Sequence, residues 1–180
     1  MAVLVEAISV IIRADALLSK FLGGWDAFKS RVPNNTLCAD NEIVRVGFMS
    51  PPDVESFVRL LERSGLTHLE NGQAIDLVVA DQLHGTASPC SWIDFGHVNL
   101  GSDPKKRIAA CRFSGSSNMQ LVTPPGWTFE NSLSQSFGFA PTEHVDKSLT
   151  YLRHENGLDV YLNSVTREEV YIGRTGEDAT

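Results

Sequence analysis

One short segment near the middle of the chain gathers the side chains that most often carry chemistry. It contains two imidazoles, a thiol, two carboxylates and an indole, from Asp81, His84, Cys90, Trp92, Asp94 and His97. The segment follows a predicted central strand, and the loops that leave such strands are common places for functional residues. We therefore treat these six residues as a candidate site for a ligand or a partner.

Metal binding is one chemistry that these residue types allow. Zinc takes imidazole and carboxylate ligands, so His84 and His97 could form a site together with Asp81 or Asp94. Their spacing matches no compact zinc pattern. The three cysteines are widely spaced and include no C-x-x-C pair, which indicates neither a zinc site nor a disulfide framework. A loop with hydrogen-bonded histidines explains the same residues, and we expect no metal and no cofactor.

Nucleophilic catalysis by Cys90 is a second chemistry to consider. The thiol would need a histidine base, His84 or His97, and an orienting acid such as Asp94. Reactive thiols are often presented at helix N-termini, whereas the residues after Cys90 read as a strand, which favours a buried and inert thiol. The sequence also contains no G-x-G-x-x-G, G-x-x-x-x-G-K-S/T, G-x-S-x-G or H-E-x-x-H motif. We therefore assign no catalytic residue.

The elements that must position these residues are clearest in the first half of the chain. Residues 3–12 are rich in β-branched side chains and predict a central strand that is apolar on both faces. Two short helices are expected within 15–32, before two strands at 36–39 and 43–49. Residues 74–80 predict a further strand.

The helix that follows residue 49 has the strongest local signals in the chain. Ser50 can cap it, Pro51 suits the first helical position, and Asp53 completes a capping box. One apolar stripe then runs along the helix through Val54, Phe57, Val58 and Leu61. Gly65 is expected to end it.

The resulting element order is β-α-β-β-α-β, which is the ferredoxin-like arrangement of a split βαβ unit. Its strand order places 3–12 between 74–80 and 43–49. Because side chains alternate between the faces of a strand, the helix-covered face is expected to hold Val44, Val46, Phe48, Leu77 and Val79. The opposite face is expected to hold Glu6, Arg45 and Asp76. Charges on inner strands are costly when buried without partners, so these three are expected to be solvated, mutually paired or lining a site. They form a candidate sheet-face cluster.

The second half of the chain predicts mainly strands. They are expected at 92–100, 107–113, 149–155, 158–163 and 169–173. Asn156 and Gly157 are typical of a hairpin turn. We expect these strands to extend the ferredoxin-like sheet or to pack on it.

The predicted fold class is therefore α+β. A ferredoxin-like half spans about 3–80, and an antiparallel, β-rich C-terminal half extends or covers it. We expect one compact domain over 1–173, with any sub-boundary near 81–91, and a disordered tail at 174–180 that lacks an apolar anchor.

A loop rich in glycine, proline and aromatic residues lies within 114–148, a stretch to which we assign no regular elements. Its aromatic side chains are Trp127, Phe129, Phe137 and Phe139. Exposed aromatic residues on such a loop are typical anchors for a partner. Folded back, they would be a hydrophobic cover on the sheet, an alternative that the sequence favours.

Composition and charge limit the classes of partner that the protein is expected to bind. The chain has 180 residues and a formal net charge of −7, and its one dense basic run is 105–107. An acidic surface disfavours phosphate backbones, so we expect no nucleic-acid partner. The apolar start of the chain is too short to cross a bilayer, so we expect no membrane partner. Sparse, unpaired cysteines favour a reducing cytoplasm.

Three functions fit these observations. The first is a non-enzymatic protein-binding or regulatory protein that acts through a sheet face or the aromatic loop on a partner with a basic surface. The second is a small-molecule-binding protein or enzyme built on residues 81–97. The third is a homo-oligomer joined by sheet edges such as 158–163. The sequence favours the first, without enzymatic activity.

Overall fold

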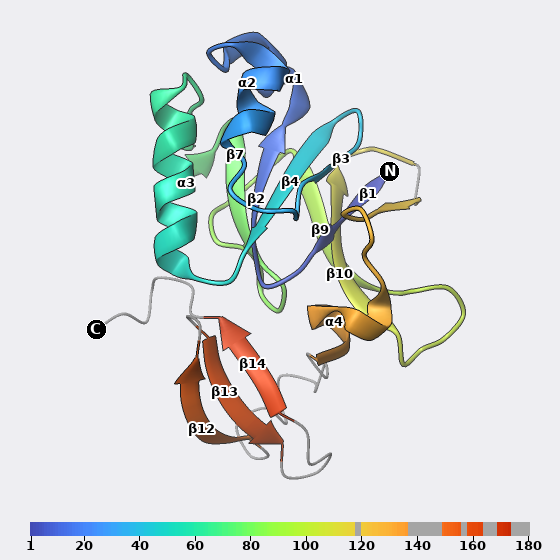
Figure 1. Cartoon of the computed structure of the whole chain (residues 1–180). Coiled ribbons are helices and arrows are strands. Elements are labelled where there is room, and N and C mark those ends of the chain that lie inside the picture. Colours follow the sequence, from blue (N-terminus) through green and yellow to red (C-terminus); the bar gives the residue numbers. More distant parts are fainter. Residues whose placement is uncertain (118–119, 137–148, 156–157, 164–168, 174–180) are drawn as a thin grey trace.

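The computed structural model describes the chain except for residues 118–119, 137–148, 156–157, 164–168 and 174–180 (Figure 1). Three predictions lie outside the described residues. They are the disordered tail, the hairpin turn at Asn156 and Gly157, and the positions of Phe137 and Phe139.

The predicted first strand is two strands that belong to different sheets. β1 (Ala2–Val5) and β2 (Ile8–Arg13) are separated by a bend at Glu6 and Ala7. Ala7 takes a φ of 48°, which lies in the left-handed region that non-glycine residues rarely adopt. The prediction of one continuous strand over 3–12 is therefore wrong, because a backbone bend redirects the chain from one sheet into the other.

β2 lies at the centre of a five-stranded sheet with the order β3-β4-β2-β7-β8, which we call the helix-covered sheet. The other strands are β3 (Cys38–Ala39), β4 (Ile43–Phe48), β7 (Leu77–Asp81) and β8 (Gly85–Thr86). All neighbours are antiparallel, and Val10 of β2 stands opposite Val46 and Val79. The predicted neighbours of the first strand are confirmed.

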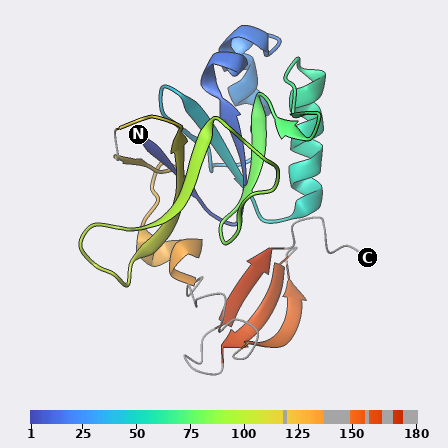
Figure 2. The ribbon, with the colours of Figure 1, turned by 180° about the vertical axis from the view of Figure 1, so that it is seen from behind.

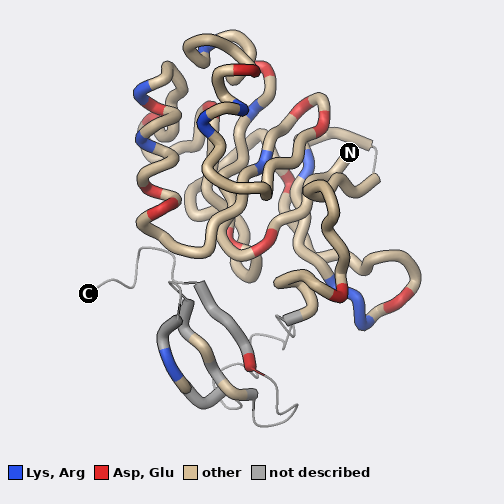
Figure 3. The backbone as a smooth tube through the Cα atoms, in the orientation of Figure 1, with Lys and Arg blue, Asp and Glu red and all other residues tan. Residues whose placement is uncertain are grey.

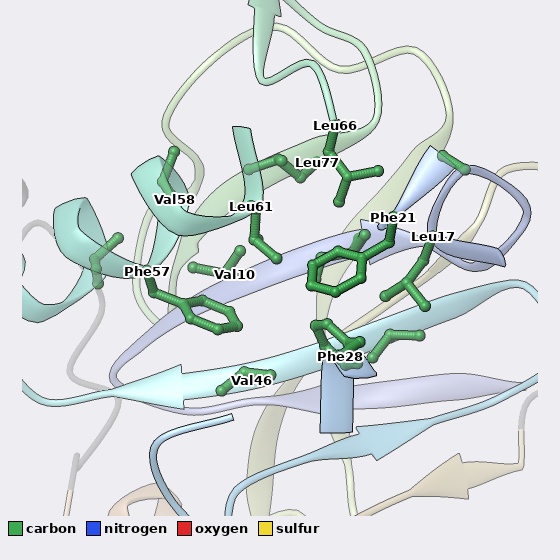
Figure 4. Close-up of a cluster of buried hydrophobic side chains, with 14 of the residues drawn as sticks. Val10, Leu17, Phe21, Phe28, Val46, Phe57, Val58, Leu61, Leu66 and Leu77 are labelled. Atoms are coloured by element: carbon green, nitrogen blue, oxygen red, sulfur yellow. The ribbon is translucent and has the colours of Figure 1, made fainter. Parts of the chain in front are cut away.

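Three helices cover one face of this sheet (Figure 1). They are α1 (Ala14–Lys20), α2 (Gly24–Arg31) and α3 (Pro51–Arg63). The Ser50 hydroxyl accepts a hydrogen bond from the Asp53 amide at 3.4 Å, as the capping signal predicts. Figure 4 shows the cluster between helices and sheet, where Phe57 and Leu61 point toward Val10 and Val46 and Phe28 lies beside Phe21. The cluster includes Val44, Val46, Phe48 and Leu77, and Val79 packs against it, so the predicted helix-covered face is confirmed.

The opposite face of the helix-covered sheet is covered by a second sheet with the order β11-β1-β10-β9 (Figures 1 and 2). Its strands beyond β1 are β9 (Ile93–Asn99), β10 (Arg107–Phe113) and β11 (Leu121–Val122). Buried residues of both sheets, such as Val5, Ile11, Val78 and Ala109, form one cluster between them. The prediction that later strands extend this sheet or pack on it is confirmed for β9 and β10, which pack on it. This packing covers the sheet face through which a partner was expected to bind.

A short hairpin, a 3₁₀ turn and a short helix accompany these two sheets. A hairpin is formed by β5 (Leu69–Glu70) and β6 (Gln73–Ala74), and a 3₁₀ turn at Phe129–Asn131 leads into α4 (Leu133–Ser136). Among the described helices, none is long and apolar enough to cross a membrane.

The last three strands form a separate sheet, which we call the C-terminal sheet (Figure 1). β12 (Leu149–Glu155), β13 (Leu158–Asn163) and β14 (Glu169–Gly173) have the predicted bounds. β13 is the middle strand and pairs with a neighbour on each side. The idea that 158–163 is a free edge for oligomerisation is therefore wrong. Homo-oligomerisation itself and the single compact domain stay predictions.

Candidate functional site

A cavity of about 450 Å³ opens where the bend after β1 meets β4 and two loops. We call it the Glu6 cavity. One wall is the loop at 124–127, and another is the segment around 34–36. Its polar and aromatic lining comes from Glu6, Asn34, Thr36, Arg45, Phe48, Asp53 and Trp127. Three of these residues, Glu6, Arg45 and Trp127, belong to two separate candidate groups that the sequence analysis proposed.

The Glu6 carboxylate is held from one side only. Its Oε1 accepts hydrogen bonds from Trp127 Nε1 at 3.1 Å, from Ser134 N at 3.1 Å and from Ser134 Oγ at 2.6 Å. The residue is 9% exposed. Within the described chain, Oε2 accepts no hydrogen bond and Glu6 has no ion-pair partner. The three donors fix the orientation of a mostly buried carboxylate whose second oxygen is an unused acceptor.

Arg45 lies beneath the same cavity and is 2% exposed. Its Nε donates to Ser9 Oγ at 2.9 Å, its Nη1 to Thr36 O at 3.3 Å and its Nη2 to Glu6 O at 3.0 Å. Burial lowers the pKa of Arg45, while the Cys38 thiol and the Glu6 carboxylate act in the opposite direction. Arg45 therefore bonds to neutral groups and stands near Glu6 without a direct ion pair in the described chain.

Gly47 makes room for the Arg45 guanidinium. A Cβ atom built on Gly47 would lie 2.8 Å from Arg45 Cζ and closer still to Nη2, which no ordinary packing allows. The backbone of Gly47 also forms hydrogen bonds with the segment around residues 34–36. Its amide donates to Thr36 Oγ1 at 2.6 Å, and its carbonyl accepts from Asn34 Nδ2 at 2.7 Å. The glycine thus positions both the buried charge and one wall of the cavity.

The aromatic loop folds back on the second sheet, which is the alternative that the sequence favours. Phe129 is 9% exposed and forms a small buried cluster with Leu4 and Ile108. Trp127 is half-buried, packs against that cluster and donates to Glu6. The tip at Pro125 stays exposed. The loop is therefore both a cover for the sheet and a wall of the Glu6 cavity.

Asp76 is separated from the two charges with which the sequence groups it. Both of its carboxylate oxygens lie 2.9 Å from Lys20 Nζ, and Oδ2 also accepts from Thr67 N at 2.8 Å. Asp76 precedes β7, and its partners come from the end of α1 and the connection after α3. The three-residue cluster is therefore wrong. Asp76 is a structural ion-pair partner, and Glu6 and Arg45 alone share the cavity.

Part of the 81–97 segment gathers around one tight turn. Asp81 Oδ1 accepts from Leu83 N at 2.7 Å and from His84 N at 3.0 Å, and lies 3.2 Å from His84 Nδ1. His97 Nε2 is 2.8 Å from the carbonyl oxygen of Gln82. These contacts stabilise the turn after β7, as expected for a loop whose polar side chains satisfy its own backbone.

The remaining residues of this segment point elsewhere. Trp92 Nε1 donates to Ala74 O at 3.1 Å, and burial raises the pKa of the Cys90 thiol. The Asp94 carboxylate accepts one hydrogen bond from Arg112 Nε at 3.4 Å and another from Ser114 Oγ at 3.0 Å. Because strand residues alternate between faces, Asp94 and His97 lie on opposite faces of β9. In the part of the chain that the structure describes, no group of three potential metal ligands comes together.

The six residues of the 81–97 segment therefore do not form one site. Asn34, Thr36 and Gly47 also belong to the Glu6 cavity, although none of them is among the candidate residues predicted from the sequence. A signal was present in Arg45-Val46-Gly47, because an arginine and a glycine two positions apart on a strand share one face. No protein-family model matches the sequence, and comparison with curated proteins and with solved structures finds no significant similarity.

Proposed function

We propose that this protein acts without catalysis by binding a partner protein, and that a segment of the partner enters the Glu6 cavity. The observation that carries this proposal is the meeting of Glu6, Arg45 and Trp127 at one cavity. They come from the bend, from β4 and from the aromatic loop, so distant parts of the chain converge there. A volume of about 450 Å³ is in the range of specific binding sites.

The arrangement of hydrogen bonds supports binding rather than a reaction. Arg45 is held by Ser9 and by two backbone carbonyl groups, and Thr36 Oγ1 is engaged with Asn34 and with Gly47. The described lining includes no histidine or cysteine that could pair as base and nucleophile. What the cavity offers is an oriented carboxylate oxygen beside an aromatic wall.

The scaffold gives this site a rigid base. We infer a ferredoxin-like arrangement for β2, β3, β4 and β7 with their helices, since the strand order β3-β4-β2-β7 and the antiparallel directions fit that pattern. Sites on packed strands hold their side chains more precisely than sites on loops. The thiols of Cys38, Cys90 and Cys111 are free, which suits action in a reducing cytoplasm.

Site-specific photo-crosslinking in cells that make the protein naturally tests the proposal. A photoreactive phenylalanine analogue is placed singly at Pro125 or Met49, two exposed lining positions, and at Leu69, an exposed control on the β5–β6 hairpin. We expect Pro125 and Met49 to give the same discrete protein adduct and Leu69 to give none. Trp127→Ala should reduce that adduct. The proposal fails if the cavity positions give no adduct, or if all three positions give the same one.

A further inference from the structure

We infer that the group entering the Glu6 cavity is a basic side chain, an arginine or lysine of the partner. This inference rests on the proposed function and assigns the chemistry of its ligand. The central observation is the Glu6 carboxylate, which is nine-tenths buried and keeps an unused oxygen. A buried carboxylate without an ion-pair partner is costly. A cation from the partner would remove that cost and use the free oxygen.

The second observation is the balance of charge around the cavity. Glu6 and Asp53 are acidic and Arg45 is basic, and Asp53 is exposed at the rim. Arg45 is less accessible to a ligand than the carboxylates, because it is 2% exposed and donates hydrogen bonds to Ser9 Oγ and to the carbonyls of Thr36 and Glu6. The carboxylates are therefore the more accessible charges, which favours a cation over an anion.

The walls suit the rest of a basic side chain. Pro124, Pro125 and the ring of Trp127 line the cavity beside Glu6. Long basic side chains bury their aliphatic stems along apolar surface, and their charged ends interact favourably with indole faces. The bond from Trp127 Nε1 to Glu6 Oε1 fixes the ring next to the carboxylate. The apolar walls would contact the aliphatic stem of one basic side chain while Glu6 and the indole ring contact its charged end.

The net charge of the whole chain also favours a basic ligand. The net charge of −7 attracts basic partners before contact. In Figure 3 the basic positions of the described chain are spread over separate elements instead of forming one stripe. An anionic ligand would have to approach an acidic protein and reach Arg45, which is 2% exposed, in a cavity that also holds the carboxylates of Glu6 and Asp53.

Nuclear magnetic resonance of the full-length protein tests the inference, with the Trp127 indole N–H as reporter. The probe is Nα-acetyl-arginine methylamide, and its matched neutral and acidic counterparts are the citrulline and glutamate derivatives. We expect a saturable shift with the arginine compound and binding at least about tenfold weaker for both counterparts. Glu6→Gln should weaken arginine binding about tenfold while preserving the size of the side chain. Asp26→Asn, which removes an exposed charge on α2, should leave it unchanged.

The outcomes separate this inference from the proposed function. Equal binding of arginine and citrulline derivatives, or preference for glutamate through Arg45, overturns the basic ligand even when crosslinking identifies a partner in the cavity. Absence of a crosslinked partner overturns the proposed function instead. Asp53→Asn, at an exposed position, provides a second variant if Glu6→Gln unfolds, and it should weaken arginine binding in the same direction.

Discussion

At the scale of single residues, the decisive pair is Arg45 and Gly47. Arg45 is nearly inaccessible, yet each of its described partners is a neutral oxygen. The guanidinium can take this position because Gly47, two residues along the same face of β4, has no side chain. The two residues should therefore be energetically coupled, and the coupling can be measured.

We predict that Gly47→Ala lowers the free energy of unfolding by about 1–3 kcal/mol, because the new methyl group overlaps the guanidinium. In an Arg45→Ala background the same substitution should cost much less, since the overlapping group is gone. Urea unfolding of the four proteins in this double-mutant cycle gives the coupling directly. Gly96→Ala is the control, because no atom lies near its Cβ position on β9, and it should change stability by less than about 0.5 kcal/mol. Additive effects would contradict the proposed overlap.

At the scale of elements, the bend between β1 and β2 decides where the site lies. Gln82 holds the bend through two hydrogen bonds to Ala7. Its side-chain Oε1 accepts from Ala7 N at 2.8 Å, and its backbone N–H donates to Ala7 O at 2.9 Å. Gln82 is 1% exposed and comes from the turn after β7. This clamp keeps Ala7 in its left-handed conformation and sends the Glu6 side chain toward Trp127.

We predict that Gln82→Leu lowers the free energy of unfolding by about 1–3 kcal/mol, because the buried Ala7 amide loses its acceptor. The Trp127 indole N–H resonance should also shift, since Glu6 follows the bend. His84→Ala, at an exposed side chain of the same turn, should leave that resonance in place. An unchanged Trp127 signal in folded Gln82→Leu would show that the clamp does not position Glu6.

At the scale of the whole molecule, the helix-covered sheet is the central layer. Helices pack on one face of it and the second sheet on the other, and each contact has its own hydrophobic cluster. A third cluster lies under the aromatic loop. The described residues of the C-terminal sheet belong to none of these three clusters. The residues that line the Glu6 cavity or bond to Glu6 all lie at or before Ser134, although α4, which supplies Ser134, also contacts β14.

We predict that the chain ending at Ser136 folds with its three hydrophobic clusters and its Glu6 cavity intact. It should unfold in one cooperative thermal transition and keep the Trp127 indole resonance of the full chain. Circular dichroism and a two-dimensional NMR spectrum would check both points. Loss of the cooperative transition would show that the C-terminal sheet is required for the fold and not an addition to it.

Much of the local structure follows from the sequence alone. The apolar stripe and capping residues of α3 predict that helix, and alternation predicts β10 and the strands of the C-terminal sheet. Element order predicts that β2 lies between β4 and β7. These features depend on periodicity and caps within short stretches of chain, which is why they can be read from neighbouring residues.

The site was decided only by the tertiary structure. Residues 3–12 read as one apolar strand, and long-range contacts from Gln82 and Arg45 hold the bend at Glu6 and Ala7. Glu6 meets Trp127 and Ser134 more than a hundred residues away in the chain. No local pattern encodes such a meeting, because it depends on how two sheets and a loop pack. The sequence by itself thus determined the elements and their order, whereas packing determined which charged residues are buried together and which cavity they share.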